Sequence, residues 1–335
     1  MTVTSLASLT RISDLASEAY DVARIDRSMW ASGDYVAAEV TGAPHRLYGI
    51  ELASGRTVRA LPGDRVIGAF GNRSATLEGV GSWSDIQGFE MNAMTSAGLF
   101  GAVTSMSQVI PPTLRLTYLG HVVRNGKKVR MSDFAIHSSH KSFSVPTVLL
   151  VGTSMSAGKT TTGRLIVHEL AGMGYKVVGA KLTGAGRYRD ILSFQDAGAE
   201  AVFDFVDAGL PSTVEPESVF RDAIRPLLRH IDSLQPDFLI AEAGASPLEP
   251  YNGTAAIEEL NDNVRYTVLC ASDPYAVVGV EKAFGLVPDL VTGPATSTSA
   301  AIDLVRKLTG VPALNVMDPD SIGQLRDSLR QTLGV

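Results

Sequence analysis

The chain has 335 residues with a hydrophobic fraction of 45% and a formal net charge of −6. This length suits two domains, each with enough apolar residues for its own core. The acidic balance, without a basic stripe, argues against a nucleic-acid partner bound through phosphate contacts. The single cysteine excludes a disulfide framework, and the sequence has no run of about 18 apolar residues that could span a membrane.

The first 140 residues are predicted to form a β-rich domain, with one helix around residues 12–24. Short alternating segments follow, separated by Gly, Pro, Asn and Asp, which is the pattern of strands joined by turns. The glycine-dense stretches indicate either curvature or close backbone approach to a ligand, and curvature is the simpler interpretation. The clearest predicted strands are 35–40, 65–70 and 118–123, and residues 124–130 have the pattern of a hairpin with a polar turn.

A serine-rich segment, 137–144, separates this domain from the rest of the chain. His137 and His140 stand three residues apart within it and could together bind a metal. No third ligand is recognisable nearby, so a polar linker is the simpler interpretation. The sequence therefore predicts a β-rich domain over 1–140 and a second domain over 145–335.

The second domain opens with an apolar strand that leads into a glycine-bounded loop. Such a loop points backbone N–H groups at one spot, adds the charge of Lys159, and offers the Thr160 hydroxyl to Mg²⁺. We expect the Lys159 side chain to be solvated while no ligand is bound. The alternative is a chance Gly-Lys-Thr after a strand. The predicted phosphate-binding residues are Gly152, Ser154, Ser156, Ala157, Gly158, Lys159, Thr160 and Thr161.

Residues 145–335 alternate strands and helices in the manner of a doubly wound α/β domain, with a mostly parallel sheet between two helical layers. Cys270 falls inside one of these strands and is expected to be buried. The predicted strands are 147–151, 176–182, 237–242, 265–271, 289–293 and 312–316. The predicted helices are about 160–173, 217–233, 254–261, 275–285, 297–309 and 319–332.

Charged residues occur near the ends of two of these strands. Lys181 ends the second predicted strand, Glu242 ends the third, and Asp190 lies between them in the chain. Ligands gather beyond the carboxyl ends of parallel strands, where these residues and the loop fall. Mg²⁺ prefers hydroxyl, carboxylate, phosphate and water oxygens, so Thr160, Asp190 and Glu242 form a consistent ligand set. The alternatives are a solvated lysine, a helix-capping aspartate and a surface glutamate.

The loop resembles that of dethiobiotin synthetase, which has the form G-T-D-x-x-V-G-K-T. This chain has the same five residues between Gly152 and Gly158, with Ser154 where that family has Asp. The resemblance continues over roughly a hundred residues on short motifs. It implies a P-loop fold that binds ATP and Mg²⁺, and Lys181 is the position that matches a substrate-contacting lysine.

Three further positions carry this resemblance. Asp190 matches an aspartate near the metal, and Glu242 matches the strand-end carboxylate that reaches Mg²⁺. Segments 288–296 and 310–316 resemble late strands whose loops enclose the nucleotide base, which implies base contact at Asn315.

The chain also resembles a largely uncharacterised two-domain P-loop family that includes D-glutamate N-acetyltransferases. The shared features are residues 202–209, the β-rich first domain and the five-residue gap in the loop. Members of that family have Met where this chain has Thr160. The hydroxyl restores a magnesium ligand and favours a nucleoside triphosphate over the diphosphate of coenzyme A.

Three functional classes follow from these features. The first is an ATP- and Mg²⁺-dependent ligase or kinase that acts on a small, anionic carboxylate or amine, with Lys159 and Lys181 in catalysis. The second is an acyltransferase that holds acyl-CoA by its diphosphate. The third is a GTPase, for which the usual Asn-Lys-x-Asp motif is missing from the sequence. We expect a cytoplasmic homodimer with a small-molecule substrate and neither a nucleic-acid nor a membrane partner.

Overall fold

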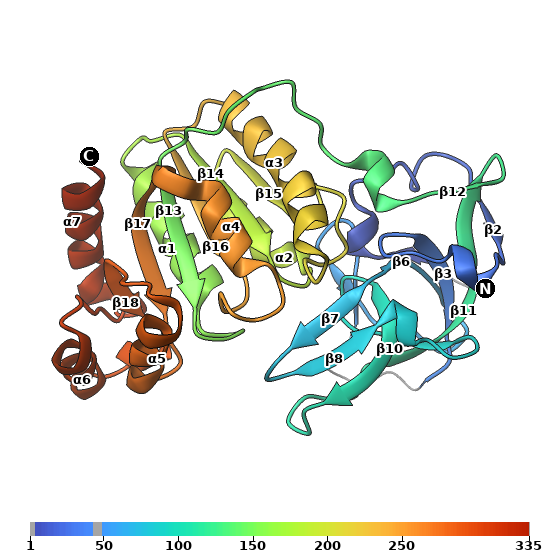
Figure 1. Cartoon of the computed structure of the whole chain (residues 1–335), viewed down its shortest axis with the longest axis horizontal. Coiled ribbons are helices and arrows are strands. Elements are labelled where there is room, and N and C mark those ends of the chain that lie inside the picture. The colour runs from blue at the N-terminus through green and yellow to red at the C-terminus, as the bar shows by residue number, and fades with distance from the viewer. Residues whose placement is uncertain (1–3, 43–48, 335) are drawn as a thin grey trace. The chain divides into compact units, whose positions relative to one another are not determined.

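The computed structural model describes residues 4–42 and 49–334, which divide into two compact units (Figure 1). Unit 1 comprises Met1–His137, Ala185–Arg189 and Phe205–Leu227. Unit 2 comprises Ser138–Gly184, Asp190–Asp204 and Leu228–Val335. The chain therefore returns to unit 1 twice after the serine-rich segment. None of the helices in the described residues has the length and apolar character needed to cross a bilayer.

Unit 1 is β-rich, as the sequence predicts. Eight strands of its ten-stranded sheet follow the order β1-β6-β3-β11-β9-β10-β8-β7, and β2 and β12 each pair with β11 outside this order. An additional pairing of β6 with β10 closes five of these strands into a barrel, and β4 and β5 form a separate two-stranded sheet. The strands are β1 Thr4–Leu6, β2 Asp21–Ala23, β3 Tyr35–Val40, β4 Ile50–Glu51, β5 Thr57–Val58, β6 Arg65–Phe70, β7 Asn72–Ala75, β8 Gly79–Ser82, β9 Glu90–Ala93, β10 Leu99–Met106, β11 Leu114–Arg124 and β12 Lys127–Lys128.

Local chemistry explains how the barrel turns and packs. The predicted hairpin forms between β11 and β12, with Asn125 and Gly126 at φ 51° and 74°, the pair of positive values that a type I′ turn requires. A Cβ at Gly68 would lie 2.3 Å from the carbonyl oxygen of Gly98, so this glycine permits close backbone packing. The core is aromatic, with the Trp30 ring 4.9 Å from Phe70 and 4.6 Å from Tyr118 between centroids.

The predicted helix over 12–24 is wrong. The chain there makes turns and then forms strand β2, which pairs antiparallel with β11. The Ser13 hydroxyl donates to Thr10 O and the Ser17 hydroxyl to Asp14 O. Such local side-chain bonds compete with the helical hydrogen-bond ladder. The pairing of β2 with β11 then favours an extended backbone over a helix in residues 21–23.

Unit 2 is a doubly wound α/β unit, which confirms the predicted fold class. Its six strands are all parallel in the order β15-β14-β16-β13-β17-β18. The strands are β13 Thr147–Gly152, β14 Val177–Thr183, β15 Ala201–Asp204, β16 Phe238–Ala243, β17 Val264–Cys270 and β18 Leu290–Thr292. The helices that lie entirely in unit 2 are α1 Lys159–Gly172, α4 Gly253–Leu260, α5 Pro274–Phe284, α6 Ser299–Thr309 and α7 Ile322–Leu333. Two further helices, α2 Tyr188–Asp196 and α3 Glu217–Ser233, include residues of both units.

The winding direction reverses at the two central strands. From β13 the chain moves two positions to one side to form β14, and from β16 it moves two positions to the other side to form β17. Strands β13 and β16 are neighbours, so the switch point lies between them. Ligands of doubly wound sheets bind in the crevice beyond the carboxyl ends of the strands at such a point.

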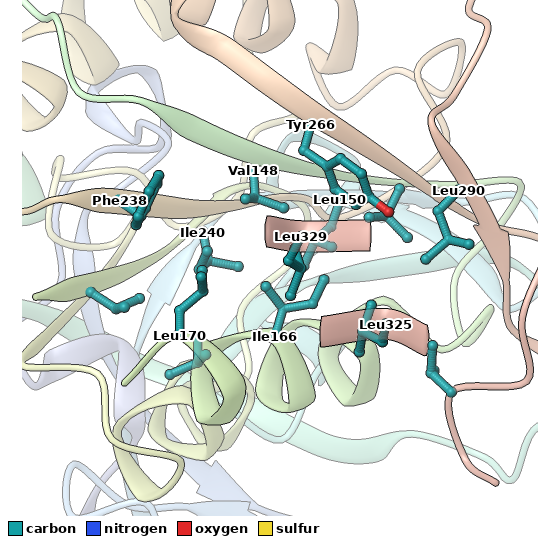
Figure 2. Packing of buried hydrophobic residues seen from close by; sticks show 14 of the residues in the cluster. Val148, Leu150, Ile166, Leu170, Phe238, Ile240, Tyr266, Leu290, Leu325 and Leu329 are labelled. Carbon is teal, nitrogen blue, oxygen red and sulfur yellow. The ribbon is translucent and has the colours of Figure 1, made fainter. Parts of the chain in front are cut away.

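One core covers the face of the sheet that meets α1 and α7 (Figure 2). Val148 and Leu150 of β13 pack with Ile166 of α1 and Leu329 of α7, all completely buried. The alternate residues of β13, Leu149 and Val151, point to the other face of the sheet and are also buried, so both faces of this strand are covered. A strand buried on both faces explains why its sequence is continuously apolar.

Two further differences from the prediction concern short elements. The predicted strand over 312–316 is reduced to one bridge between Ala313 and Val291, because Pro312 has no N–H to donate and the Asn315 side chain accepts from Met317 N in a turn. Strand β15 and helix α2 are not among the predicted elements. Only Ile191 and Phe194 of α2 are buried, too short an apolar pattern to identify a helix.

Candidate functional site

The loop after β13 has the geometry of a phosphate-binding loop. Strand β13 ends at Gly152, and α1 begins at Lys159. Gly158 directly precedes the helix as its N-cap and has a φ of 96°, a value that favours glycine. Ser156 also has a positive φ, 61°, which is uncommon for a residue with a side chain. The N–H groups of Lys159, Thr160 and Thr161 have no acceptor in the described part of the chain. They form the first turn of a helix and are available to an anion.

Two neighbouring strands fix the position of this loop. Thr153 N donates to Cys270 O at the end of β17, at 3.1 Å, and the Thr153 hydroxyl bonds to the backbone and side chain of Ser272. A Cβ at Gly293, after β18, would lie 2.5 Å from the carbonyl oxygen of Ala157. The loop is therefore held in place by contacts with residues that the motif alone does not identify.

Lys159 is buried, so the prediction that its side chain is solvated is wrong. It is 4% exposed, and its Nζ donates to Ser154 O at 2.8 Å across the loop. A Cβ at Gly152 would lie 2.5 Å from Nζ, so the glycine makes room for the folded-back lysine. Burial lowers the pKa of Lys159, and the charge of Glu242 only partly opposes this effect. A buried ammonium of this kind gains from an incoming anion.

Glu242 lies directly beside the loop, near the carboxyl end of strand β16. It is 2% exposed on β16, so it is not a surface glutamate. Its Oε2 accepts the Thr160 hydroxyl at 3.0 Å. These two predicted metal ligands, one in the first turn of α1 and one on β16, are thus in direct contact.

Buried Lys181 forms an ion pair with the partly buried Asp190 and also lies near Glu242. Lys181 Nζ lies 2.5 Å from Asp190 Oδ2 and 3.6 Å from Glu242 Oε1. Lys181 is 7% exposed, which excludes the solvated alternative. Burial acts to lower the pKa of Lys181, but the neighbouring carboxylates of Asp190 and Glu242 outweigh it and raise the pKa above its ordinary value.

The donor set around Glu242 fits Mg²⁺ better than a metal that needs an all-protein cage. In residues 4–42 and 49–334 no group of three or more His, Cys, Asp or Glu side chains could hold a metal ion. Mg²⁺ needs only one or two carboxylates, because phosphate and water oxygens complete its octahedral shell. The Thr160 hydroxyl and the Glu242 carboxylate meet this requirement. Asp190 is engaged with Lys181, and its role as a metal ligand stays a prediction.

The remaining predicted residues lie at several places around the loop. The Ser154 hydroxyl donates to Met155 O at 3.0 Å, and Ala157 is 2% exposed. Thr161 is exposed in the first turn of α1. Asn315 follows the bridge between Ala313 and β18, and its role as a base contact stays a prediction.

Sequence reasoning missed the residues that support the loop. Thr153 donates its N–H to the carbonyl oxygen of Cys270, and its hydroxyl bonds to Ser272. Gly293 contributes the space that its missing Cβ leaves. The only signal for Gly293 is its place between the end of a predicted strand and Pro294. Such a glycine also occurs in ordinary turns, so this signal does not identify a site.

The sheet order, the loop and the buried lysine together define a P-loop protein of the α/β class. No protein-family model matches the chain, and no curated protein matches it. Several solved structures show low similarity to it. Chloroplast FtsY from Physcomitrella patens is 15% identical with a TM-score of 0.38, over 59% of this chain and 71% of that one.

Two other structures give similar values. The hydrogenase maturation factor HypB from Archaeoglobus fulgidus is 16% identical with a TM-score of 0.38, over 57% of this chain and 91% of that chain. The 54 kDa signal recognition particle protein from Aeropyrum pernix K1, solved in complex with GDP, is 19% identical with a TM-score of 0.35, over 58% of this chain and 47% of that chain.

Proposed function

We propose that unit 2 binds ATP with Mg²⁺ and transfers the terminal phosphoryl group to a small carboxylate or amine, as a kinase or a ligase does. The observation that carries this proposal is the pair of buried lysines, Lys159 and Lys181, which both lie close enough to Glu242 to feel its charge. A protein that only holds a nucleotide needs one loop lysine. A second cation, built into a neighbouring strand end, suits an anionic acceptor.

Each residue of the loop has a defined task in this proposal. The amides of Lys159 to Thr161 bind phosphate oxygens at the positive end of α1, and Lys159 exchanges its bond to Ser154 O for a phosphate oxygen. Thr160 and Glu242 would hold Mg²⁺. The metal, when bound, neutralises charge that develops on the phosphoryl oxygens.

Lys181 acts as a cation and not as a base. Its raised pKa keeps it protonated at neutral pH, so it has no lone pair with which to attack or to accept a proton. A protonated, nearly buried ammonium can bind a carboxylate, a carbamate or an acyl phosphate made from the acceptor. The resemblance to dethiobiotin synthetase supports the same role. The expected homodimer stays a prediction.

Nucleotide-dependent product formation tests this function. The protein is incubated with MgATP or MgGTP and a panel of small carboxylates and amines, and nucleoside diphosphate release is measured. We expect ADP release that depends on one acceptor class. Lys181→Ala should raise the KM for the acceptor more than that for ATP, whereas Lys307→Ala on α6 should leave both unchanged.

Two outcomes would replace this proposal. Acceptor-independent release of GDP from GTP alone would favour a GTPase. Transfer of an acyl group from acyl-CoA without a nucleotide would show that the loop binds the diphosphate of coenzyme A. A selective loss of ATP binding in Lys181→Ala would reverse the role given to that residue.

A further inference from the structure

Glu51 of strand β4 is a buried carboxylate that caps a helix distant from it in sequence. It is 1% exposed and accepts hydrogen bonds from Tyr188 N at 2.8 Å and Arg189 N at 3.1 Å. The Ser8 hydroxyl donates to the same carboxylate at 2.5 Å. All four residues belong to unit 1. The two amides are in the first turn of α2, where a negative charge is favoured by the helix dipole.

The boundary between the units falls inside this first turn, at the peptide bond between Arg189 and Asp190. Asp190 is thus the next residue after Arg189, whose amide donates to Glu51. Within unit 2, its side chain binds Lys181 Nζ at 2.5 Å, and Lys181 lies 3.6 Å from Glu242. The first turn of α2 therefore carries both residues that donate to Glu51 and the carboxylate that binds Lys181.

We propose that Glu51 is a positioning residue for Lys181 and acts through the first turn of α2 and Asp190. A helical turn transmits displacement, because each residue advances only about 1.5 Å and is fixed by its neighbours. Without the Glu51 carboxylate, the amides of Tyr188 and Arg189 lose their acceptor, and the first turn of α2 no longer fixes the position of the Asp190 side chain. Misplacement of about 1 Å is enough to impair a reacting group. Only the kinetic consequence rests on the proposed function.

The first test measures the position of Lys181 without any nucleotide. Intact protein is treated with an amine-acetylating reagent, and modification of each lysine is followed by mass spectrometry. Lys181 is buried and paired, so it reacts only through local opening. We expect Glu51→Gln to raise its modification rate about tenfold, the scale of a lost charge–dipole interaction, while Lys159 reacts as in the wild type.

A matched control removes a similar cap that does not lead to the site. Asp26 accepts from Ser28 N at 2.8 Å and caps a short 3₁₀ helix in unit 1. Asp26→Asn should leave the modification of Lys181 unchanged. Where Glu51→Gln does not fold, Ser8→Ala removes only the hydroxyl partner of Glu51 and should change Lys181 in the same direction by a smaller factor.

The second test separates positioning from a merely structural role. Glu51→Gln should lower ADP release about tenfold in the wild-type background and less than about twofold in a Lys181→Met background, since coupled sites are not additive. Equal factors in both backgrounds, or an unchanged modification rate of Lys181, would overturn the proposal. A wild-type protein that releases no diphosphate would refute the proposed function, and the modification rates would still decide the role of Glu51.

Discussion

The substitution Lys159→Met tests the central electrostatic feature of the site, because it keeps the length of the side chain and removes the buried charge. Lys159 is 4% exposed, and within the described residues its side chain makes one hydrogen bond, from Nζ to Ser154 O. A buried ammonium with a single neutral partner costs stability in the nucleotide-free protein. We therefore expect Lys159→Met to leave the melting temperature of the nucleotide-free protein unchanged or to raise it.

The same substitution should remove most of the stabilisation by nucleotide. At a ligand concentration of 100 Kd, MgATP stabilises the wild type by about 2.7 kcal/mol. That corresponds to a rise of about 5–11 °C for a unit of this size. A lost charge-assisted hydrogen bond of about 2–3 kcal/mol weakens binding roughly 30- to 140-fold. At the same ligand concentration about 0.3–0.9 kcal/mol remains, or about 1–4 °C.

The dependence of binding on pH provides a second readout of the same charge. A phosphate beside Lys159 raises its lowered pKa again, so nucleotide affinity falls as pH rises through the pKa of the nucleotide-free protein. In the nucleotide-free protein the sign is opposite. Between the lowered pKa and the ordinary value of 10.5 the folded state binds fewer protons than the unfolded state, so stability rises with pH. Both dependences should disappear in Lys159→Met.

Differential scanning fluorimetry with and without MgATP measures all of these effects. The control is Lys176→Met, which removes another lysine whose Nζ donates to a backbone carbonyl, that of Leu234 at 2.6 Å. It should leave the nucleotide-induced shift intact. A full shift in Lys159→Met would refute the assignment of the loop. A nucleotide-free protein that loses several degrees would refute the inference that this buried charge is unfavourable.

Three other predictions concern the surroundings of the loop. Glu242→Gln should raise the Mg²⁺ concentration for half-maximal activity about tenfold, on the scale of one lost ligand contact, and a titration that matches the wild type would exclude Glu242 as a ligand. Gly152→Ala should displace the flexible end of the Lys159 side chain and weaken nucleotide binding with little loss of stability. Gly293→Ala places a Cβ 2.5 Å from a backbone oxygen at a φ of 90°, so it should destabilise unit 2 by about 1–3 kcal/mol in denaturant titrations. Cys270 is completely buried, and burial raises the pKa of its thiol to about 11, so at pH 7 a thiol reagent should modify it only at the rate of unfolding; rapid modification of native protein would contradict its place in the core.

The sequence predicted those parts of the fold that depend on local patterns. Strand β13 and helix α1 could be identified because an apolar run, a glycine-bounded loop and a helical apolar pattern occur in succession. Helix α2 has only two buried residues, and its N-terminus is capped by Glu51, which is more than a hundred residues away. No local pattern contains such a cap. The same reason explains the false helix over 12–24, where pairing of β2 with β11 decided the structure.

The candidate site shows the same division between motif and environment. The sequence predicted Lys159 from the loop motif, and Lys181 and Glu242 from their positions near strand ends. It did not reveal that Lys159 is buried, because burial depends on the space left by Gly152 and on the carbonyl of Ser154. The sign of a pKa shift depends on neighbours that only the folded chain brings together.

The two lysines of this site have opposite electrostatic environments, and this difference argues for separate roles. Lys159 lies against a neutral carbonyl, and burial lowers its pKa, so it is the group that gains most from an added anion. Lys181 already has Asp190 and Glu242 beside it, and its pKa is raised. When two titratable groups in one site have pKa values shifted apart, their chemical tasks differ. This difference supports the proposal that Lys159 binds the phosphate and that Lys181 is a fixed cation, which its carboxylate partners hold in place for a second, more weakly bound anion.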